Sequence, residues 1–287
     1  YFSWPYYIMF FLWEQALNIK TMQKWKNDIS EMNLSLQTRK RYYKYLSAML
    51  NFCVKMEYIV SNPLKAVGNF RDTTFDKPQD KMQYYTAEQF IKFITAAGKS
   101  NKTFADWSFY VFFYIAFYTG MRKGEINALK WSDIEGNIIH VRRSIAQKLK
   151  GDDIETPPKN KSSYRDLEIP IPLSQVLTAH KERQKALPGF TEENRICGGV
   201  ACLRDTTIDY RNRKYANEAG LPRIRIHDFR HSHVSLLCNE GINIQEIARR
   251  LGHTKIDMTW NTYSHLYPRE EERAMKVLNA IQPPQIE

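Results

Sequence analysis

Apolar positions recur at helical spacing through most of this chain, and polar, glycine or proline runs separate the helices that they predict. The first helical stretch covers residues 12–70, where SLQTRKRYYKYLSAMLNFCVKMEYIV carries apolar residues three and four apart and SNP closes the pattern. Further on, TAEQFIKFITAAG begins with a threonine suited to cap a helix and runs to Gly98. The segment WSFYVFFYIAFY, at 107–118, is apolar on every side, which predicts a helix buried in a core.

Two stretches rich in β-branched residues interrupt the helical pattern. NIIHVRRSIAQ (137–147) and YRDLEIPI (164–171) predict two strands, and a lysine-rich connection joins them. Helical signals return in IHDFRHSHVSLLCNEG, which ends at Gly241, and in INIQEIARRLG, which ends at Gly252. Near the end of the chain, NTYSHLYP places Tyr263 in a short polar run.

The charge balance changes the picture from a generic helical protein to one with a polyanionic partner. The 287 residues hold 42 Lys and Arg against 31 Asp and Glu, a formal net charge of +11, which favours nucleic acid or an anionic membrane surface. No apolar run approaches the roughly 20 residues that span a bilayer, so we expect no membrane insertion. A basic stretch lies in the first helical segment, at Arg39, Lys40, Arg41 and Lys44. Composition alone leaves open that these residues only solvate a surface.

Length and composition predict two domains in a reducing compartment. The polar run RDTTFDKPQDKMQ (71–83) contains Pro78 and lacks apolar periodicity, which indicates a linker between two basic lobes that could close around a duplex. The four cysteines are scattered, a pattern typical of free thiols in the cytoplasm. The chain begins with Tyr1 and not with Met, so we expect a further N-terminal portion.

Candidate chemistry first occurs in TGMRKGEINALKW (119–131). Arg122 and Glu125 are three residues apart on one helical face, so the carboxylate can hold the guanidinium in place. Taken alone, such a pair is an ordinary surface ion pair.

A second cluster lies in HDFRHSH, where imidazole and guanidinium groups share a helical face. His227 and Arg230 are three apart, and arginine suits a phosphate because its planar fork donates two parallel hydrogen bonds. For His231 and His233 the simpler interpretation is packing or support. A zinc site is disfavoured, because the residues between the histidines include a cation and no glutamate base.

The last candidates follow the helix predicted for INIQEIARRLG. Gly252 supplies the left-handed residue that ends this helix, so His253 projects from a fixed corner, and Tyr263 follows ten residues later. A lone tyrosine is more often an amphipathic surface residue than a nucleophile. Two arginines, two histidines, a lysine-rich hairpin and a late tyrosine, however, form a set in which cations neutralise a phosphodiester while a phenol attacks it.

The motifs TGMRKGE, HDFRH, LGH and NTYSH, in this order, resemble those of the tyrosine recombinases, the phage integrase family, and are most similar to integrases of phages and integrative or conjugative transposons. The resemblance is strong over about 84–267 and weaker over 12–70. It implies a mainly α fold with a small antiparallel β-sheet in a two-domain architecture. The expected parts are a helical core DNA-binding domain (1–75), a linker (76–83), a mixed α/β catalytic domain (84–268) and a C-terminal helix or tail (269–287).

The resemblance also implies a role for each matching residue in site-specific DNA recombination. Tyr263 would attack a scissile phosphate and form a 3′-phosphotyrosyl bond, Arg122 and Arg230 would grip the non-bridging oxygens, and His253 would add a third donor. His227 would accept and return the proton at the nucleophile. Glu125 would orient Arg122.

The general acid for the leaving oxygen would be a lysine of the hairpin. Lys159 is preferred and Lys161 is the alternative. This chemistry stores the bond energy in the phosphotyrosine and needs no ATP, metal ion or other cofactor.

The resemblance further implies partners for the reaction. These are double-stranded DNA at element ends or attachment sites, and a homo-tetramer in the active synapse, with an accessory DNA-bending or excision factor as a possible addition. The tail REEERAMKVLNAIQPP has apolar residues at helical spacing, which predicts docking on a neighbouring protomer, with packing on its own domain as the alternative.

Three rival functions remain open at the level of sequence. GINIQEIARRLGH also resembles the first part of a helix-turn-helix, which suggests a DNA-binding regulator without catalysis. A type IB topoisomerase would share the tyrosine nucleophile but relax supercoils as a monomer. A metal-dependent hydrolase is the most distant alternative.

Overall fold

The computed structural model describes residues 17–71, 82–100, 103–148, 153–157 and 163–267, together with residues 271 and 275. The chain divides into two units, Tyr1–Asp80 and Lys81–Glu287. Most of the expected linker (76–83) and of the expected C-terminal tail (269–287) lies outside the described residues. Within the described part, no helix is both long enough and apolar enough to cross a membrane.

The first unit is helical, as the sequence predicted. It contains α2 (Ile19–Glu31), α3 (Leu36–Lys55) and the short α4 (Leu64–Val67). The side chains of Asn18 and Ser35 accept hydrogen bonds from the first turns of α2 and α3, which supplies partners for otherwise unpaired backbone N–H groups. Apolar residues from all three helices and the α3–α4 connection form a small core of Met22, Leu50, Cys53, Ile59 and Leu64.

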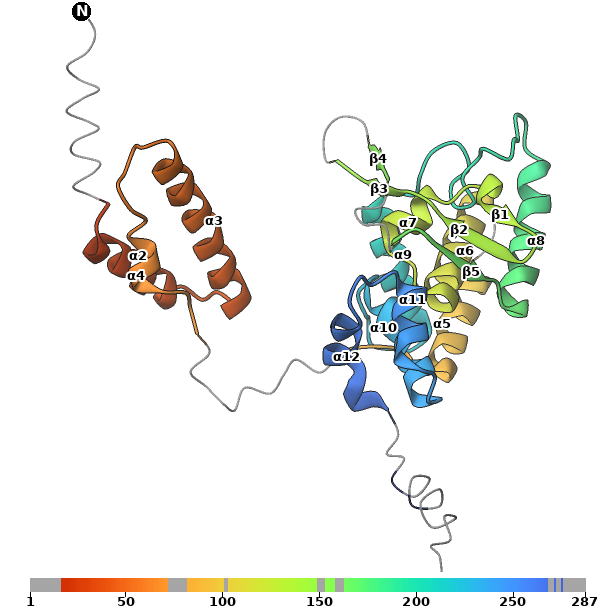
Figure 1. The fold of residues 1–287 in the computed structure, drawn as a ribbon. Helices are drawn as coiled ribbons and strands as arrows, with labels where there is room; N and C mark the ends of the chain where they lie inside the picture. Colours follow the sequence, from red (N-terminus) through yellow and green to blue (C-terminus); the bar gives the residue numbers. More distant parts are fainter. Residues whose placement is uncertain are drawn as a thin grey trace, which may run out of the picture. The chain divides into compact units, whose positions relative to one another are not determined.

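The second unit is built around α6 (Phe104–Thr119), which packs against α5 (Ala87–Lys99), α8 (Ile171–Lys185) and α10 (Asp228–Asn239) (Figure 1). Neighbours on several sides explain why α6 is apolar all round, and residues such as Phe112, Phe113 and Ile115 are fully buried. Capping boxes begin both α5, at Thr86, and α6, at Thr103. α5 continues through Gly98 to Lys99, so the predicted stop at this glycine was one residue early.

Small antiparallel sheets confirm the predicted fold class, although the strands are more divided than the sequence indicated. β1 (Ile134–Glu135), β2 (Ile138–Val141) and β5 (Arg165–Glu168) form one sheet in the order β1-β2-β5, and β3 (Ser144–Ala146) pairs with β4 (Ile154–Thr156). The predicted strand 137–147 is thus two strands. The predicted strand 164–171 ends before Pro170, because α8 begins there with prolines in positions that a helix start tolerates.

The short α7 (Lys123–Ala128) is the helix expected after Gly120. Three other helices of the second unit were left without an assignment: α8, α9 (Asp205–Glu218) and α12 (Ile256–Tyr263). The polar run expected around Tyr263 is the end of α12, followed by a 3-10 turn at Ser264–Leu266. Packing overrides the weak helix propensity of this segment, because α12 lies against α11 (Ile244–Leu251) and α10.

Candidate active site

Arg122 lies at the junction of two helices. α6 ends at Thr119, and Gly120 adopts the left-handed conformation, with φ of +63°, that turns the chain. Arg122 is the N-cap residue of α7, and Glu125 accepts hydrogen bonds of 2.9 Å from its backbone N–H and from its Nη1. The predicted ion pair is therefore present, and it orients a guanidinium whose side chain is still 40% exposed.

Glu125 is shared with a second arginine, Arg165 of β5, which was not among the candidate residues. Arg165 Nη2 donates to Glu125 Oε2 at 2.7 Å, and its Nε donates to the Arg250 carbonyl at 2.6 Å. Burial of Glu125 works to raise its pKa, but hydrogen bonds and charge from Arg165 and Arg122 outweigh it, so the pKa lies below its ordinary value. Glu125 is therefore ionised at neutral pH between two guanidinium groups.

Arg230, in the first turn of α10, ties the ends of two other helices together. Its side chain is buried, Nη1 donates to the Gly120 carbonyl at 2.7 Å, and Nη2 donates to the Leu251 carbonyl at 2.7 Å. Burial lowers the pKa of Arg230, yet a guanidinium remains protonated at neutral pH. The site thus holds a fixed buried positive charge between the C-terminal ends of α6 and α11.

His253 follows Gly252, whose left-handed conformation (φ +67°) ends α11 as predicted. Its Nε2 lies 2.9 Å from Arg230 Nη2, and its Nδ1 lies 2.8 Å from Thr259 Oγ1. Since arginine can only donate, Nε2 is the acceptor and Nδ1 carries the proton toward Thr259. Burial, followed by the charges of Arg230 and Arg122, lowers the pKa of His253 to about 4, so the ring is neutral at neutral pH.

Tyr263 is the last residue of α12 and is only 3% exposed. It lies in an apolar cluster with Val234, Cys238, Ile247 and Leu251. Its hydroxyl is hydrogen-bonded to Nδ1 of His231 at 2.6 Å. Burial raises the pKa of Tyr263 to about 12, although the nearby charge of Arg230 acts in the opposite direction.

The three histidines at and after the start of α10 have different environments. His227, expected at the nucleophile, is the exposed N-cap residue of the helix, and its ring lies edge-on to that of His231 with centroids 5.2 Å apart. Partial burial of the His227 imidazole, followed by the charges of His231 and Arg230, lowers its pKa to about 4, although the residue as a whole is exposed. The imidazole hydrogen-bonded to Tyr263 is that of His231. His233 is buried and hydrogen-bonded to the Phe117 carbonyl at 2.9 Å, a packing role.

The predicted lysines and the basic residues of α3 are not part of the geometry described above. Lys159 and Lys161 fall between β4 and β5, outside the described residues. On α3, Arg41 and Lys44 are exposed, and Lys40 is partly exposed. Arg39 is partly exposed as well, and its Nη2 donates to the Met32 carbonyl at 3.0 Å.

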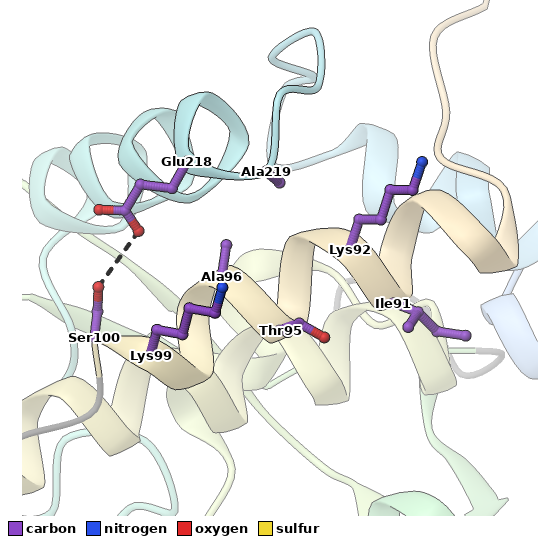
Figure 2. Close-up of a pocket in the computed structure, with 8 residues that line it drawn as sticks. All are labelled: Ile91, Lys92, Thr95, Ala96, Lys99, Ser100, Glu218 and Ala219. Atoms are coloured by element: carbon purple, nitrogen blue, oxygen red, sulfur yellow. Dashed lines mark hydrogen bonds between the residues drawn. The ribbon is translucent and has the colours of Figure 1, made fainter.

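Of two surface hollows in the second unit, one borders the candidate site and the other does not. One of about 450 Å³ is lined by residues that include Arg165 and His253, so it borders the arginine and histidine cluster. Another, between α5 and α9, has Lys92 and Lys99 at its wall and a 3.4 Å hydrogen bond from Ser100 to Glu218 (Figure 2), and none of the candidate residues lines it.

In the described part of the chain, no group of three or more His, Cys, Asp or Glu residues is placed to hold a metal ion.

Comparison with known proteins places this arrangement in a family. The profile of the phage integrase family matches residues 83–270. A XerC-like tyrosine recombinase of Caldanaerobacter subterraneus subsp. tengcongensis is 30% identical over 91% of this chain and 70% of its own length. The ICEBs1 integrase of Bacillus subtilis is 31% identical over 93% of this chain and 72% of its own length.

A solved structure shows the same fold. The Tn1549 transposon integrase, determined in complex with a circular intermediate DNA, superposes with a TM-score of 0.71 at 20% identity, covering 92% of this chain and 86% of the other. These findings do not favour the regulator or the topoisomerase interpretation. The motif resemblance seen in the sequence is confirmed: the chain belongs to the phage integrase family, the tyrosine-type site-specific recombinases.

Proposed function

We propose that this protein cuts and rejoins double-stranded DNA at specific sites through a 3′-phosphotyrosyl bond to Tyr263, and so integrates or excises a mobile element. One observation carries the proposal. Arg230 is hydrogen-bonded to His253 and to the ends of α6 and α11, and its charge acts on Tyr263, whose hydroxyl is hydrogen-bonded to the neighbouring His231. A phenol beside fixed cations is the arrangement that attack on a phosphodiester requires.

The two arginines would bind the non-bridging oxygens of the scissile phosphate. Arg230 is held rigidly by two backbone carbonyls, whereas the Arg122 side chain is half-exposed and oriented by Glu125. The charges of both arginines act on His253, which places all three groups within electrostatic reach of one another. Negative charge that builds up in the transition state would meet donors that are already oriented, so little reorganisation is needed.

His253 would be the third donor to the phosphate. Because Nε2 accepts a hydrogen bond from Arg230, it can donate only after it gains a proton or after the ring changes its partner. An approaching phosphate would favour both changes. Its negative charge raises the pKa of a nearby imidazole, which favours gain of a proton, and its oxygens compete for the Arg230 donors, which frees Nε2.

A lysine of the β4–β5 connection would protonate the leaving 5′-oxygen. Lys159 is the preferred candidate and Lys161 the alternative. Their roles separate with a substrate whose leaving oxygen is replaced by sulfur, since a thiolate leaves without a general acid. We expect the sulfur substrate to restore cleavage by whichever of Lys159→Ala or Lys161→Ala removes the acid; failure to restore either variant would contradict a lysine acid in this connection.

The DNA and the other partners follow from the same chemistry. The exposed basic residues of α3 support contact between the first unit and phosphates, because the release of counterions drives such binding. The determined complex of the Tn1549 integrase contains DNA, which supports a duplex as substrate. Exchange between two duplexes needs several active sites, so we propose a homo-tetramer, with the tail after 268 docking on a neighbouring protomer and with DNA-bending or excision factors as accessory partners.

The test uses a nicked duplex that carries the element-end sequence, with chelator present and ATP absent. A covalent protein–DNA adduct on a denaturing gel is expected, and it should vanish in Tyr263→Phe. Tyr267→Phe is the matched control, because this tyrosine lies four residues later and its hydroxyl donates to the Ile242 carbonyl instead. Tight DNA binding without any adduct would contradict the proposed function and favour a non-catalytic binder.

A further inference from the structure

The residue directly after Arg230 has a contact that the family resemblance did not assign. His231 Nδ1 lies 2.6 Å from the Tyr263 hydroxyl, and the two rings are 5.5 Å apart between centroids. His231 is in the first turn of α10 and Tyr263 ends α12, so the contact joins two helices that are far apart in sequence. The imidazole therefore touches the atom that would attack the phosphate.

A buried carboxylate lies on the other side of the same ring. Asp228 Oδ1 is 3.9 Å from His231 Nε2, one helical turn earlier on α10, and Asp228 is fully buried. Asp228 is itself held by the backbone N–H of Arg225 at 2.8 Å and by the Arg225 guanidinium. At 3.9 Å the carboxylate makes no hydrogen bond to Nε2, but its negative charge favours the tautomer with the proton on that nitrogen, which leaves Nδ1 as the acceptor for the phenol proton.

From this order of carboxylate, imidazole and phenol we infer that His231 is the general base that removes the proton from Tyr263 during DNA cleavage, with Asp228 stabilising the imidazolium that forms. The inference rests on the function proposed above. As the Tyr263 oxygen forms its bond to phosphorus, its O–H bond breaks and the proton moves to His231 Nδ1. The bond from phosphorus to the 5′-oxygen breaks in turn, and the leaving oxygen takes a proton from the lysine proposed above, in the β4–β5 connection.

The electrostatics of the described residues fit this direction of proton transfer. Burial lowers the pKa of His231, so its ring is neutral at neutral pH and can accept a proton. The Tyr263 phenol does not ionise unaided, because burial raises its pKa to about 12. Proton transfer must then accompany the attack rather than precede it, which is general base catalysis. The charged and titratable groups that face His231 are Asp228, Arg225, Arg230 and His227 from α10 and the segment before it, and Tyr263 from α12.

The resemblance gave the proton-transfer role to His227 and left His231 with packing or support, but it is His231 that contacts the Tyr263 hydroxyl. His227 is exposed at the start of α10. The ring of His231 contacts both other rings: its centroid lies 5.2 Å from that of His227 and 5.5 Å from that of Tyr263. His227 is thereby left to interact with the phosphate or with His231, while the proton of Tyr263 passes to His231.

The test compares single-turnover cleavage of the nicked element-end duplex by the wild-type protein, His231→Gln and a control, His140→Gln. His140 belongs to β2, and its Nδ1 is hydrogen-bonded to Asp166 and Arg142, neither of which is a candidate site residue. Loss of a general base costs about 100-fold or more, so His231→Gln should cleave at least that much more slowly while the control is unchanged. The wild-type rate should level off above the pKa of His231, whereas the variant rate should keep rising with pH, because only the ionised phenol then reacts.

A sulfur leaving group distinguishes a base from an acid. The slow cleavage by His231→Gln should persist on the 5′-bridging phosphorothiolate duplex, since the lost group acts on Tyr263. Restoration of the rate by sulfur would overturn the inference, as would cleavage by His231→Gln within threefold of wild type with the same pH profile. Nitrogen-15 NMR of wild-type protein gives a readout independent of any variant: a proton on Nδ1 of His231 would also overturn the inference. If the wild-type protein forms no adduct at all, the proposed function fails and this inference fails with it.

Discussion

Glu125→Ala removes a buried carboxylate from between two guanidinium groups, and the structure gives the size of the effect. The side chains of Glu125 and Arg165 are only 5% and 3% exposed, so the substitution leaves a buried arginine without its counter-charge. Removing one partner of a buried pair costs about 3 to 5 kcal/mol. The contact to Arg122 adds little, because that side chain is 40% exposed and such pairs contribute about 0 to 1 kcal/mol.

The assay is urea unfolding at neutral pH with a matched control. Glu246→Ala breaks the exposed pair of Glu246 and Arg249, whose side chains are 41% and 59% exposed, and should cost less than about 1 kcal/mol. The two variants should therefore differ by at least about 2 kcal/mol in the free energy of unfolding. Equal losses would refute the view that Glu125 and Arg165 form a buried structural pair behind the site.

The same carboxylate makes a pH-dependent contribution whose sign can be worked out. The pKa of Glu125 in the folded protein lies below the ordinary value of 4.5, so the folded state binds fewer protons than the unfolded state. The stabilisation is complete above about pH 4.5 and is lost as the pH falls through the folded-state pKa. The difference between wild type and Glu125→Ala should thus shrink under acid conditions, and a difference that grows instead would contradict the assignment.

Three further predictions concern the surroundings of the site. Gly120→Ala should destabilise the protein more than Gly136→Ala in thermal unfolding, because both have positive φ but only at Gly120 would the new Cβ lie 2.8 Å from His233 Cδ2; equal losses would contradict this. Leu251→Ala should lower the free energy of unfolding by about 2 to 5 kcal/mol through a cavity beside Tyr263, and a loss below about 1 kcal/mol would show that the cluster does not pack as described. Adding EDTA should leave the rate of adduct formation unchanged, and a loss of rate restored by a divalent cation would contradict a metal-independent reaction.

Elements with a strong local pattern were predictable from the sequence. α6 is apolar on every side, follows a capping threonine and is followed by Gly120, so its burial and its end follow from local signals. The pairing of Arg122 with Glu125 likewise depends on residues three apart, which one helical turn brings together. The order of the motifs then indicated which distant residues share a site.

Other elements lack a local signal. The residues of β4 are all exposed, so no alternation of apolar and polar positions marks the strand. α9 is rich in polar residues. Its large buried apolar residues, Ile208 and Tyr215, are too few to define an apolar stripe in the sequence. Such segments take their structure from neighbours that are distant in sequence.

The supporting contacts of the site were hidden for the same reason. Arg165 meets Glu125 across 40 residues, and His231 meets Tyr263 across 32. Spacing on α10 alone does not distinguish His227 from His231, since both lie near Arg230 in sequence. Only the position of α12 against α10 shows which imidazole contacts the phenol.

The central claim, that Tyr263 forms the covalent bond to DNA, is tested most directly on the adduct itself. The protein trapped on a nicked element-end duplex is digested with protease and nuclease, and mass spectrometry locates the amino acid that carries the nucleotide. We predict a phosphodiester of Tyr263 linked to a 3′-phosphate end. A nucleotide on Tyr267, on a serine or on any other residue would contradict the account.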